Sequence, residues 1–267
     1  MDALRPAAMA GTFYPADAAA LEGELAALLG AVRPYSGHHR PKAIIAPHAG
    51  YVYSGAVAAH AYAALRTAAP VVTRVVLLGP AHRVPLRGLA LPGARAFATP
   101  LGLAEIDDEA MARAQHMGIP QDPGAHAFEH SLEVQLPFLQ HVLGGFTVLP
   151  LLVGHARADA VAETLDALWG GPETLIVVSS DLSHFLPYHE AQEADRQTAE
   201  AILALEGNLT PDQACGAHAV NGFLQTARRR ALAPNLLDLR NSGDTAGDPG
   251  RVVGYGSFAF FEDAENV

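Results

Sequence analysis

Six segments of the chain are rich in apolar residues over the length of a β-strand. Four of them are continuous apolar runs, and such runs are typical of strands buried on both faces. They predict a central sheet covered by helices. The last segment alternates better between apolar and polar positions, so we expect an antiparallel edge or return strand there. The six segments are 42–47, 74–80, 146–154, 174–180, 235–242 and 251–261.

Helical periodicity separates most of these strands. It predicts helices at about 17–32, 54–66, 130–142, 157–169, 188–206 and 217–231. The alternation of strands and helices predicts an α/β fold of three layers, α/β/α, with a central mixed, mostly parallel sheet. Segment 83–129 is less regular, and we expect short strands and loops that form a functional covering over one end of the sheet. The chain has no internal repeat or long linker, so residues 1–267 are predicted to form one domain.

Composition narrows the classes of function. The 267 residues carry a formal net charge of -11 and include a single lysine, Lys42, which argues against a nucleic-acid partner. The single cysteine, Cys215, excludes an internal disulfide and is typical of a reducing compartment. No apolar run approaches the roughly 20 residues that span a bilayer, and residues 1–15 lack the pattern of a signal peptide. We expect a soluble cytoplasmic protein that has no membrane partner.

Polar residues with metal-binding or acid–base chemistry follow four of the predicted strands. In open α/β sheets, ligands bind beyond the carboxyl ends of the strands. A single histidine at such an end is more often structural than functional, but four coincidences favour a shared site. The residues are His48, His82, the pair Asp181 and His184, and Asp244.

Two imidazoles and one carboxylate on the same face of a metal form the facial triad of non-haem Fe(II) sites. His48 and His82 would supply the imidazoles. Asp244, in an "NSGD" turn directly after a strand, is our first choice for the carboxylate, and Asp181 is the alternative. Zinc bound by the same ligands would instead make the site a hydrolase, so the spacing alone leaves the metal open.

Other residues near these strand ends have possible catalytic roles. His184 could be a general base, and Asp181 could act in catalysis or cap a helix that starts after it. His130, in the first turn of a predicted helix, either belongs to a capping segment or binds a substrate oxygen. His189 is a further candidate close to His184. Cys215 is expected to be a small buried residue.

The order of short motifs resembles that of the Memo family, whose bacterial members are described as protein B of the AmmeMemoRadiSam system. The resemblance extends from about Arg5 to Phe260. The motifs are "AGTFYP" (10–15), "IIAPHAGYVYSG" (44–55), "LLGPAH" (77–82), "TPLG" (99–102), "EHSLEVQLPFL" (129–139), "LPLLVG" (149–154), "VVSSDLSH" (177–184), "CGAHAV" (215–220) and "NSGD" (241–244).

The resemblance implies a fold similar to that of class III extradiol dioxygenases, which hold Fe(II) with two histidines and a carboxylate. It assigns His48, His82 and Asp244 as metal ligands. It assigns His184 as the base and His130 as a second histidine beside the metal. Some Memo members have cysteine at the position of Asp244, so this sequence is closer to the iron triad.

The substrate-binding candidates are Phe13, Tyr51 and His189. Phe13 stands where the animal protein has a tryptophan, beside a pocket implicated in binding phosphotyrosine peptides. The first functional hypothesis is an Fe(II)-dependent dioxygenase acting on a small-molecule substrate, with Cu or Zn as alternative metals. The other hypotheses are a peptide- or ligand-binding protein that is not catalytic, and an iron- or copper-binding redox protein.

Overall fold

The computed structural model describes residues 4–33 and 39–262 of the chain. The ends of the predicted domain, 1–3 and 263–267, lie outside the described residues. The strands form an 11-stranded sheet in the order β1-β5-β6-β7-β3-β8-β2-β11-β10, with β4 paired to β7 and β9 paired to β11. Their bounds are β1 Leu4–Arg5, β2 Pro41–Ala46, β3 Arg74–Pro80, β4 Leu89–Ala90, β5 Ala96–Thr99, β6 Gly102–Ile106, β7 Thr147–Val153, β8 Thr174–Ser179, β9 His184–Leu186, β10 Ala233–Asn241 and β11 Val252–Phe261.

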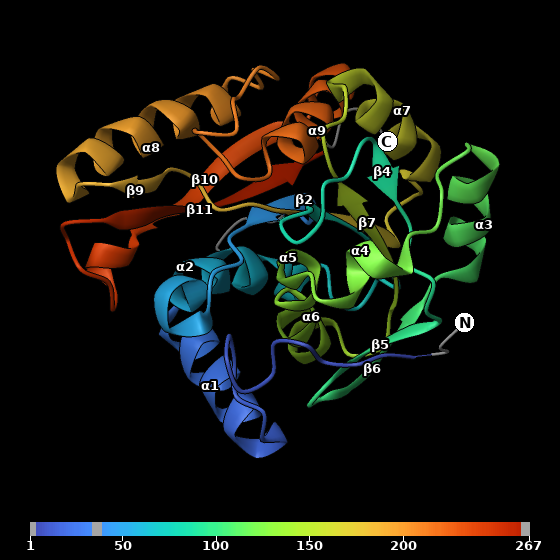
Figure 1. The fold of residues 1–267 in the computed structure, drawn as a ribbon, viewed down its shortest axis with the longest axis horizontal. Helices are drawn as coiled ribbons and strands as arrows, with labels where there is room; N and C mark the ends of the chain where they lie inside the picture. The colour runs from blue at the N-terminus through green and yellow to red at the C-terminus, as the bar shows by residue number, and fades with distance from the viewer. Residues whose placement is uncertain (1–3, 34–38, 263–267) are drawn as a thin grey trace.

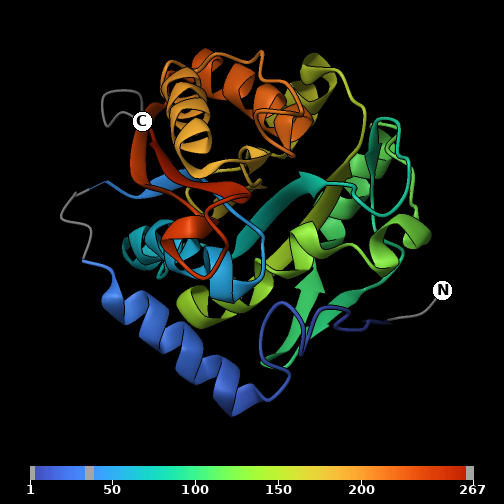
Figure 2. The same cartoon turned by 60° about the vertical axis from the view of Figure 1, so that its left-hand side comes forward.

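Helices cover both faces of this sheet (Figure 1). Helices α7, α8 and α9 lie on one face, and α1, α2, α5 and α6 lie on the other, as the view turned by 60° also shows (Figure 2). The helices are α1 Ala18–Ala31, α2 Tyr51–Ala64, α3 Asp108–His116, α4 Pro123–Ala127, α5 His130–Glu133, α6 Leu136–Leu143, α7 Ala158–Leu168, α8 Tyr188–Leu203 and α9 Ala217–Arg229, with short 3-10 turns η1 Leu65–Thr67 and η2 Ser242–Asp244.

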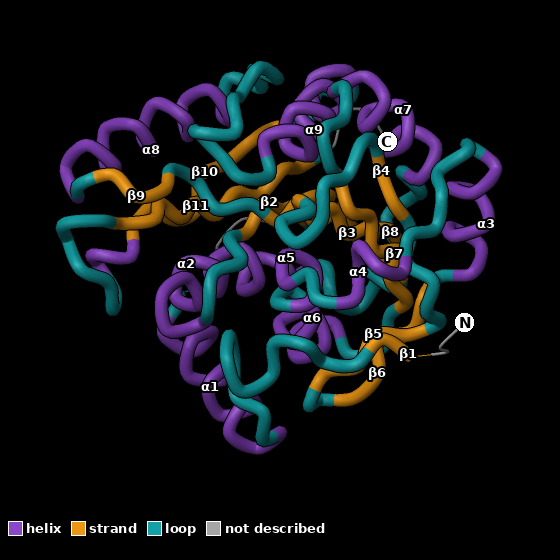
Figure 3. Tube along the Cα trace, in the orientation of Figure 1, coloured by secondary structure: helices purple, strands orange, loops and turns teal. Residues whose placement is uncertain are grey.

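The predicted fold class is confirmed. Strands β7, β3, β8 and β2 are neighbours and run parallel, and nearly all of their residues are buried. Continuous apolar runs form such strands because both faces of the sheet are covered. The result is a three-layer α/β/α arrangement with a mixed, mostly parallel centre, and it is consistent with the fold of class III extradiol dioxygenases (Figure 3).

Two local predictions differ from the structure. β11 runs antiparallel as expected, but it lies between β2 and β10 rather than at an edge. The predicted helix 130–142 is divided into α5 and α6. Pro137 explains the break, because proline has no N–H to donate and its ring clashes with the carbonyl four residues earlier, that of Glu133.

Segment 83–129 has more regular structure than the sequence predicted. β5 and β6 extend the sheet beyond β7, and α3 packs on α7. The first part of the segment, up to Arg87, does lie beyond the carboxyl ends of the central strands, where it lines a cavity. The covering expected for the whole segment is therefore limited to its beginning. Among the described residues, no helix is long and apolar enough to cross a membrane.

Candidate metal centre

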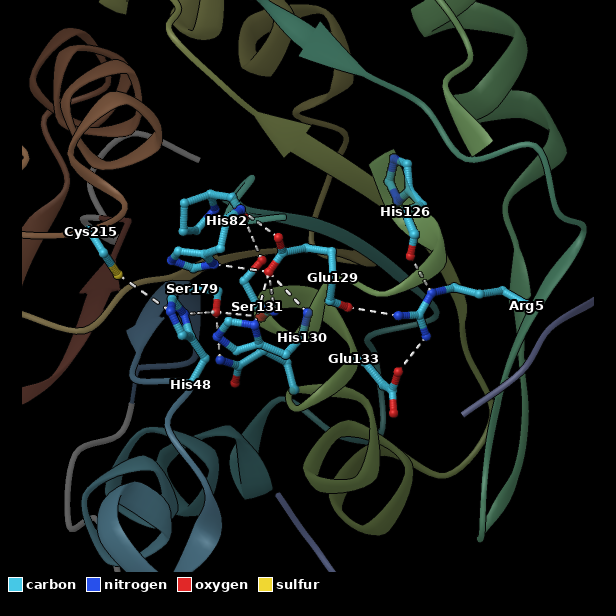
Figure 4. A network of polar contacts seen from close by, with 12 residues as sticks. Arg5, His48, His82, His126, Glu129, His130, Ser131, Glu133, Ser179 and Cys215 are labelled. Carbon is cyan, nitrogen blue, oxygen red and sulfur yellow. Dashed lines mark hydrogen bonds and ion pairs between the residues drawn. The ribbon is translucent and has the colours of Figure 1, made fainter. Parts of the chain in front are cut away.

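Three histidines meet at the edge of the sheet where the parallel strands end (Figure 4). His48 follows β2, His82 follows β3, and His130 is the first residue of α5. Strand β8 lies between β2 and β3 and runs parallel to both, so the carboxyl ends of all three strands come together. Each histidine offers one ligand nitrogen, and these nitrogens all lie within 4.8 Å of one another.

A chain of hydrogen bonds determines which nitrogen of His48 can bind a metal. The hydroxyl of Ser179 donates its single proton to the carbonyl of Ser131, 2.6 Å away, and accepts a hydrogen bond from the Gln135 side chain. Ser179 Oγ therefore acts as acceptor toward His48 Nδ1, 2.8 Å away, and this nitrogen must carry a proton. Nε2 of His48 is then the unprotonated nitrogen, whose lone pair can bind a metal.

Glu129 lies behind His82 and beside His130. Its Oε1 lies 2.9 Å from Nδ1 of His82 and 3.2 Å from Nδ1 of His130. The same carboxylate accepts hydrogen bonds from the backbone N–H groups of His82, His130 and Ser131. Nδ1 of His82 is the donor to this carboxylate, so its Nε2 is free for a metal. A carboxylate behind a histidine is a common second layer of metal sites, since it fixes the ring and makes the ligand more basic.

The pKa values favour the protonation states that metal binding needs. Burial alone would raise the pKa of Glu129, but the hydrogen bond and charge of His82 and backbone hydrogen bonds outweigh it and lower that pKa to about 2. Burial lowers the pKa of His48 well below its usual value, and the neighbouring histidines lower it further. Burial also lowers the pKa of His130 to about 4, although the charge of Glu129 opposes this. The lowered pKa values keep His48 and His130 neutral, the form of histidine that binds metals.

With this geometry established, the sequence can be compared with known proteins. The sequence model of one family, described as Memo-like protein, matches residues 5–259. The chain belongs to the Memo family. It is similar to a MEMO1 family protein of Aquifex aeolicus, with 36% identity over 270 residues that cover 94% of this chain and 97% of the relative. A MEMO1 family protein of Aeropyrum pernix is 37% identical over 279 residues, covering 94% and 98%.

The Memo resemblance had paired His48 and His82 with Asp244, but the structure brings His130 into the ligand group instead. Asp244 is held in its own turn, where its Oδ2 accepts the backbone N–H of Asn241 in a capping box. Its Oδ1 accepts a hydrogen bond from the Tyr188 hydroxyl. Both oxygens thus have hydrogen-bond partners outside the group of His48, His82 and His130.

Asp181 and His184 lie next to the centre without belonging to its ligand group. The predicted helix after Asp181 does not form, since His184 begins β9. Asp181 is buried, and its Oδ1 accepts the backbone N–H of His48 at 2.7 Å. Burial raises its pKa, although the hydrogen bond from His48 opposes the rise. Nδ1 of His184 lies 2.9 Å from the carbonyl of Leu182 and donates to it, so Nε2 of His184 can accept a proton.

The three residues predicted to bind substrate have different surroundings. The ring centre of Phe13 lies 4.9 Å from that of His130, so Phe13 borders the centre. Tyr51 is buried in the core, where its hydroxyl donates to the carbonyl of Val134. His189 is exposed on α8, and its Nδ1 lies 3.2 Å from the side-chain oxygen of Gln192.

Sequence reasoning missed the residues that support the histidines. Glu129 and Ser179 were not singled out, although Glu129 directly precedes His130 and Ser179 ends a buried strand. Cys215 was expected to be a small buried residue, but it is only partly buried and its Sγ lies 3.3 Å from Nε2 of His48. The sequence feature that could have pointed to Cys215 is its position just before the helix that forms α9. Burial and the charge of Asp181 raise the pKa of the Cys215 thiol, which keeps it protonated.

Proposed function

We propose that this Memo-family chain is a metal-dependent enzyme with one divalent metal ion bound by His48, His82 and His130. The observation that carries the proposal is the convergence of three ligand nitrogens within 4.8 Å, from three different elements. Partners behind the rings support it, because Ser179 and Glu129 hold the opposite nitrogens. Three protein ligands leave further positions open, as in catalytic rather than structural metal sites.

We propose Fe(II) as the metal and an oxygenase of extradiol type as the class of enzyme. Imidazole binds iron, copper and zinc alike, so the three histidines do not identify the metal. The relation of the fold to class III extradiol dioxygenases supports iron. When bound, Fe(II) would supply a site for both a substrate oxygen and dioxygen.

Residues beside the metal would handle protons and positioning. His184 has a free Nε2 and is the proposed proton acceptor for a substrate hydroxyl. Asp181 binds the backbone of His48 and would hold that ligand in place. Phe13 packs against His130 and would exclude water from one side of the centre.

Metal analysis after anaerobic purification tests the proposal. We expect about one iron per chain in the wild type and none in the His48→Ala variant. His141→Gln is the matched control, because His141 lies on α6, pairs with Glu22 and should not affect metal content. Oxygen consumption with a panel of catechols then tests the reaction. Zinc in place of iron, with no oxygen uptake, would contradict an oxygenase.

The contact between Cys215 and His48 favours one second candidate, a copper-binding redox protein. A thiol and an imidazole side by side are suitable ligands for Cu(I). If copper is the native metal, Cys215→Ser should weaken Cu(I) binding while the Fe(II) content of reconstituted protein stays unchanged. Equal Cu(I) affinity in both proteins would remove this candidate.

A further inference from the structure

A cavity of 890 Å³ adjoins the candidate metal centre, and none of the predicted site residues lines it. Its wall comes from three segments of the chain, within residues 80–87, 153–155 and 211–218. Two residues connect it to the histidines. Cys215 lines the cavity while its Sγ contacts His48, and Ala81 lines it immediately before His82. A molecule in this cavity would thus lie next to the metal centre.

The polar side chains of the cavity are suited to an anion. Arg87, His155 and His218 line it, and the ring centres of the two histidines lie 5.0 Å apart. The lining residues include no aspartate or glutamate. Arg87 is exposed and forms no ion pair among the residues that the structure describes. The guanidinium of Arg87 is permanently charged, so it can pair with an anion that enters the cavity.

Backbone contacts fix the two segments that carry Arg87 and His155 relative to each other. Arg87 forms a bridge with His155. Three hydrogen bonds join their neighbours: Gly88 N–H to His155 O, Gly154 N–H to Gly88 O, and His155 N–H to Leu86 O. A Cβ atom on Gly154 would lie 2.1 Å from the Leu86 carbonyl, so the two segments are in close contact. The ligand-facing wall is therefore formed before any ligand binds, which reduces the entropy cost of binding.

The rest of the wall is mainly apolar and suits a carbon skeleton. Pro80, Val84, Pro85, Leu86 and Val153 contribute to it. The first turn of α9, which carries His218, also opens on the cavity, and the positive end of a helix adds to the attraction of a negative charge.

We propose that this cavity binds the carboxylate of a small organic acid. The apolar skeleton of the acid lies along the cavity wall, and its other end faces His48, His82 and His130 of the candidate metal centre. A single permanent cation, Arg87, matches the single charge of a carboxylate better than the double charge of a phosphate. The two histidines would donate further hydrogen bonds. The orientation toward the metal rests on the proposed function, whereas binding of the anion does not.

Titration of the metal-free protein with matched probes tests the proposal. Benzoate carries the charge, benzyl alcohol has the same ring without it, and phenyl phosphate carries a phosphate. Binding is followed by the NMR signals of the histidine rings, assigned with His155→Gln and His218→Gln. We expect benzoate to shift these two signals and to bind at least ~10-fold more tightly than benzyl alcohol, a difference of about 1.4 kcal/mol.

The Arg87→Gln variant should weaken benzoate binding by a similar factor. Arg157→Gln is the control, since Arg157 is an exposed arginine paired with Asp159 and lies outside the cavity lining. Equal affinity for benzoate and benzyl alcohol, or no effect of Arg87→Gln, would overturn the proposal. Tighter binding of phenyl phosphate than of benzoate would overturn the carboxylate assignment.

Metal analysis separates this inference from the proposed function. Arg87→Gln should retain as much metal as the wild type, because Arg87 does not contact His48, His82 or His130. If the wild type binds no metal but benzoate still binds through Arg87, the proposed enzyme fails and the anion site stands. If metal binds and benzoate does not, the proposed anion site is refuted and the proposed metal-dependent enzyme is not.

Discussion

Ser179 Oγ lies 2.8 Å from Nδ1 of His48 and fixes the tautomer that leaves Nε2 free for a metal. The Ser179→Ala variant should therefore bind metal about 10- to 100-fold more weakly, as is typical when a partner behind a metal ligand is lost. Competition with a chelator measures this affinity. Ser257→Ala is the control, because Ser257 is also buried and donates to a carbonyl, that of Val57, away from the histidines. Unchanged affinity in Ser179→Ala would refute the role of the tautomer.

The third ligand can be identified by a pair of variants. His130→Ala should lose stoichiometric metal, because His130 completes the group of nitrogens within 4.8 Å. Asp244→Asn should retain it, since both oxygens of Asp244 are engaged by Asn241 and Tyr188. Elemental analysis of both proteins gives the answer. Loss of metal in Asp244→Asn with retention in His130→Ala would restore the triad of two histidines and a carboxylate.

The buried residue His126 should make stability depend on pH. Its Nε2–H donates to the Ala90 carbonyl, and its Nδ1 has no partner. Burial lowers its pKa to about 4 from 6.5. His126 takes up a proton below about pH 6.5 in the unfolded chain but only below about pH 4 in the folded chain. The free energy of unfolding therefore falls as the pH decreases from 6.5 to 4. The loss from this residue reaches about 3 kcal/mol at the acidic end.

Urea unfolding of the metal-free protein at pH 7 and pH 5 measures this effect. His126→Gln keeps a donor near Ala90 but cannot titrate, so its stability should decrease less between the two pH values than that of the wild type. His48 and His130 also have lowered pKa values and would contribute to the slope in both proteins. Identical slopes would show that His126 does not contribute.

Two glycines in helices should respond in opposite ways to alanine. A Cβ on Gly222 in α9 would lie 2.3 Å from Cβ of Val161 in α7, too close for the two helices to keep their packing. Gly222→Ala should destabilise the fold by about 1–3 kcal/mol. Gly23 in α1 has nothing within 4 Å of the added atom, so Gly23→Ala should stabilise by about 0.5–1 kcal/mol. Thermal unfolding measures both, and a neutral Gly222→Ala would contradict the close contact.

The sequence predicts the central sheet well, because strands buried on both faces contain continuous runs of apolar residues. The segments 74–80 and 174–180 each contain a run of four apolar residues, and they form β3 and β8 as expected. The histidines that follow β2 and β3 were expected at one edge of the sheet, because parallel strands end at the same edge. These two predictions need only the direction of the strands and not the packing of side chains.

The supporting residues could not be predicted because they depend on tertiary contacts. Glu129 reaches His82, 47 residues away in sequence, from a loop whose path no periodicity reveals. The surroundings of Asp244 could not be predicted for a related reason. Its position after a strand was correct, but the capping box with Asn241 and the bond to Tyr188 from α8 depend on how the turn closes.

Arg5 connects the beginning of the chain to the segment that carries His130. Its guanidinium donates to the carbonyls of His126 and Glu129, at 2.7 Å each, and pairs with Glu133 (Figure 4). These contacts join residues more than 120 positions apart, so forming them closes a long loop of the chain, which has an entropic cost. During synthesis the three histidines leave the ribosome before Ser179 does. The nascent chain therefore presents the three histidines before Ser179, which binds Nδ1 of His48, is available.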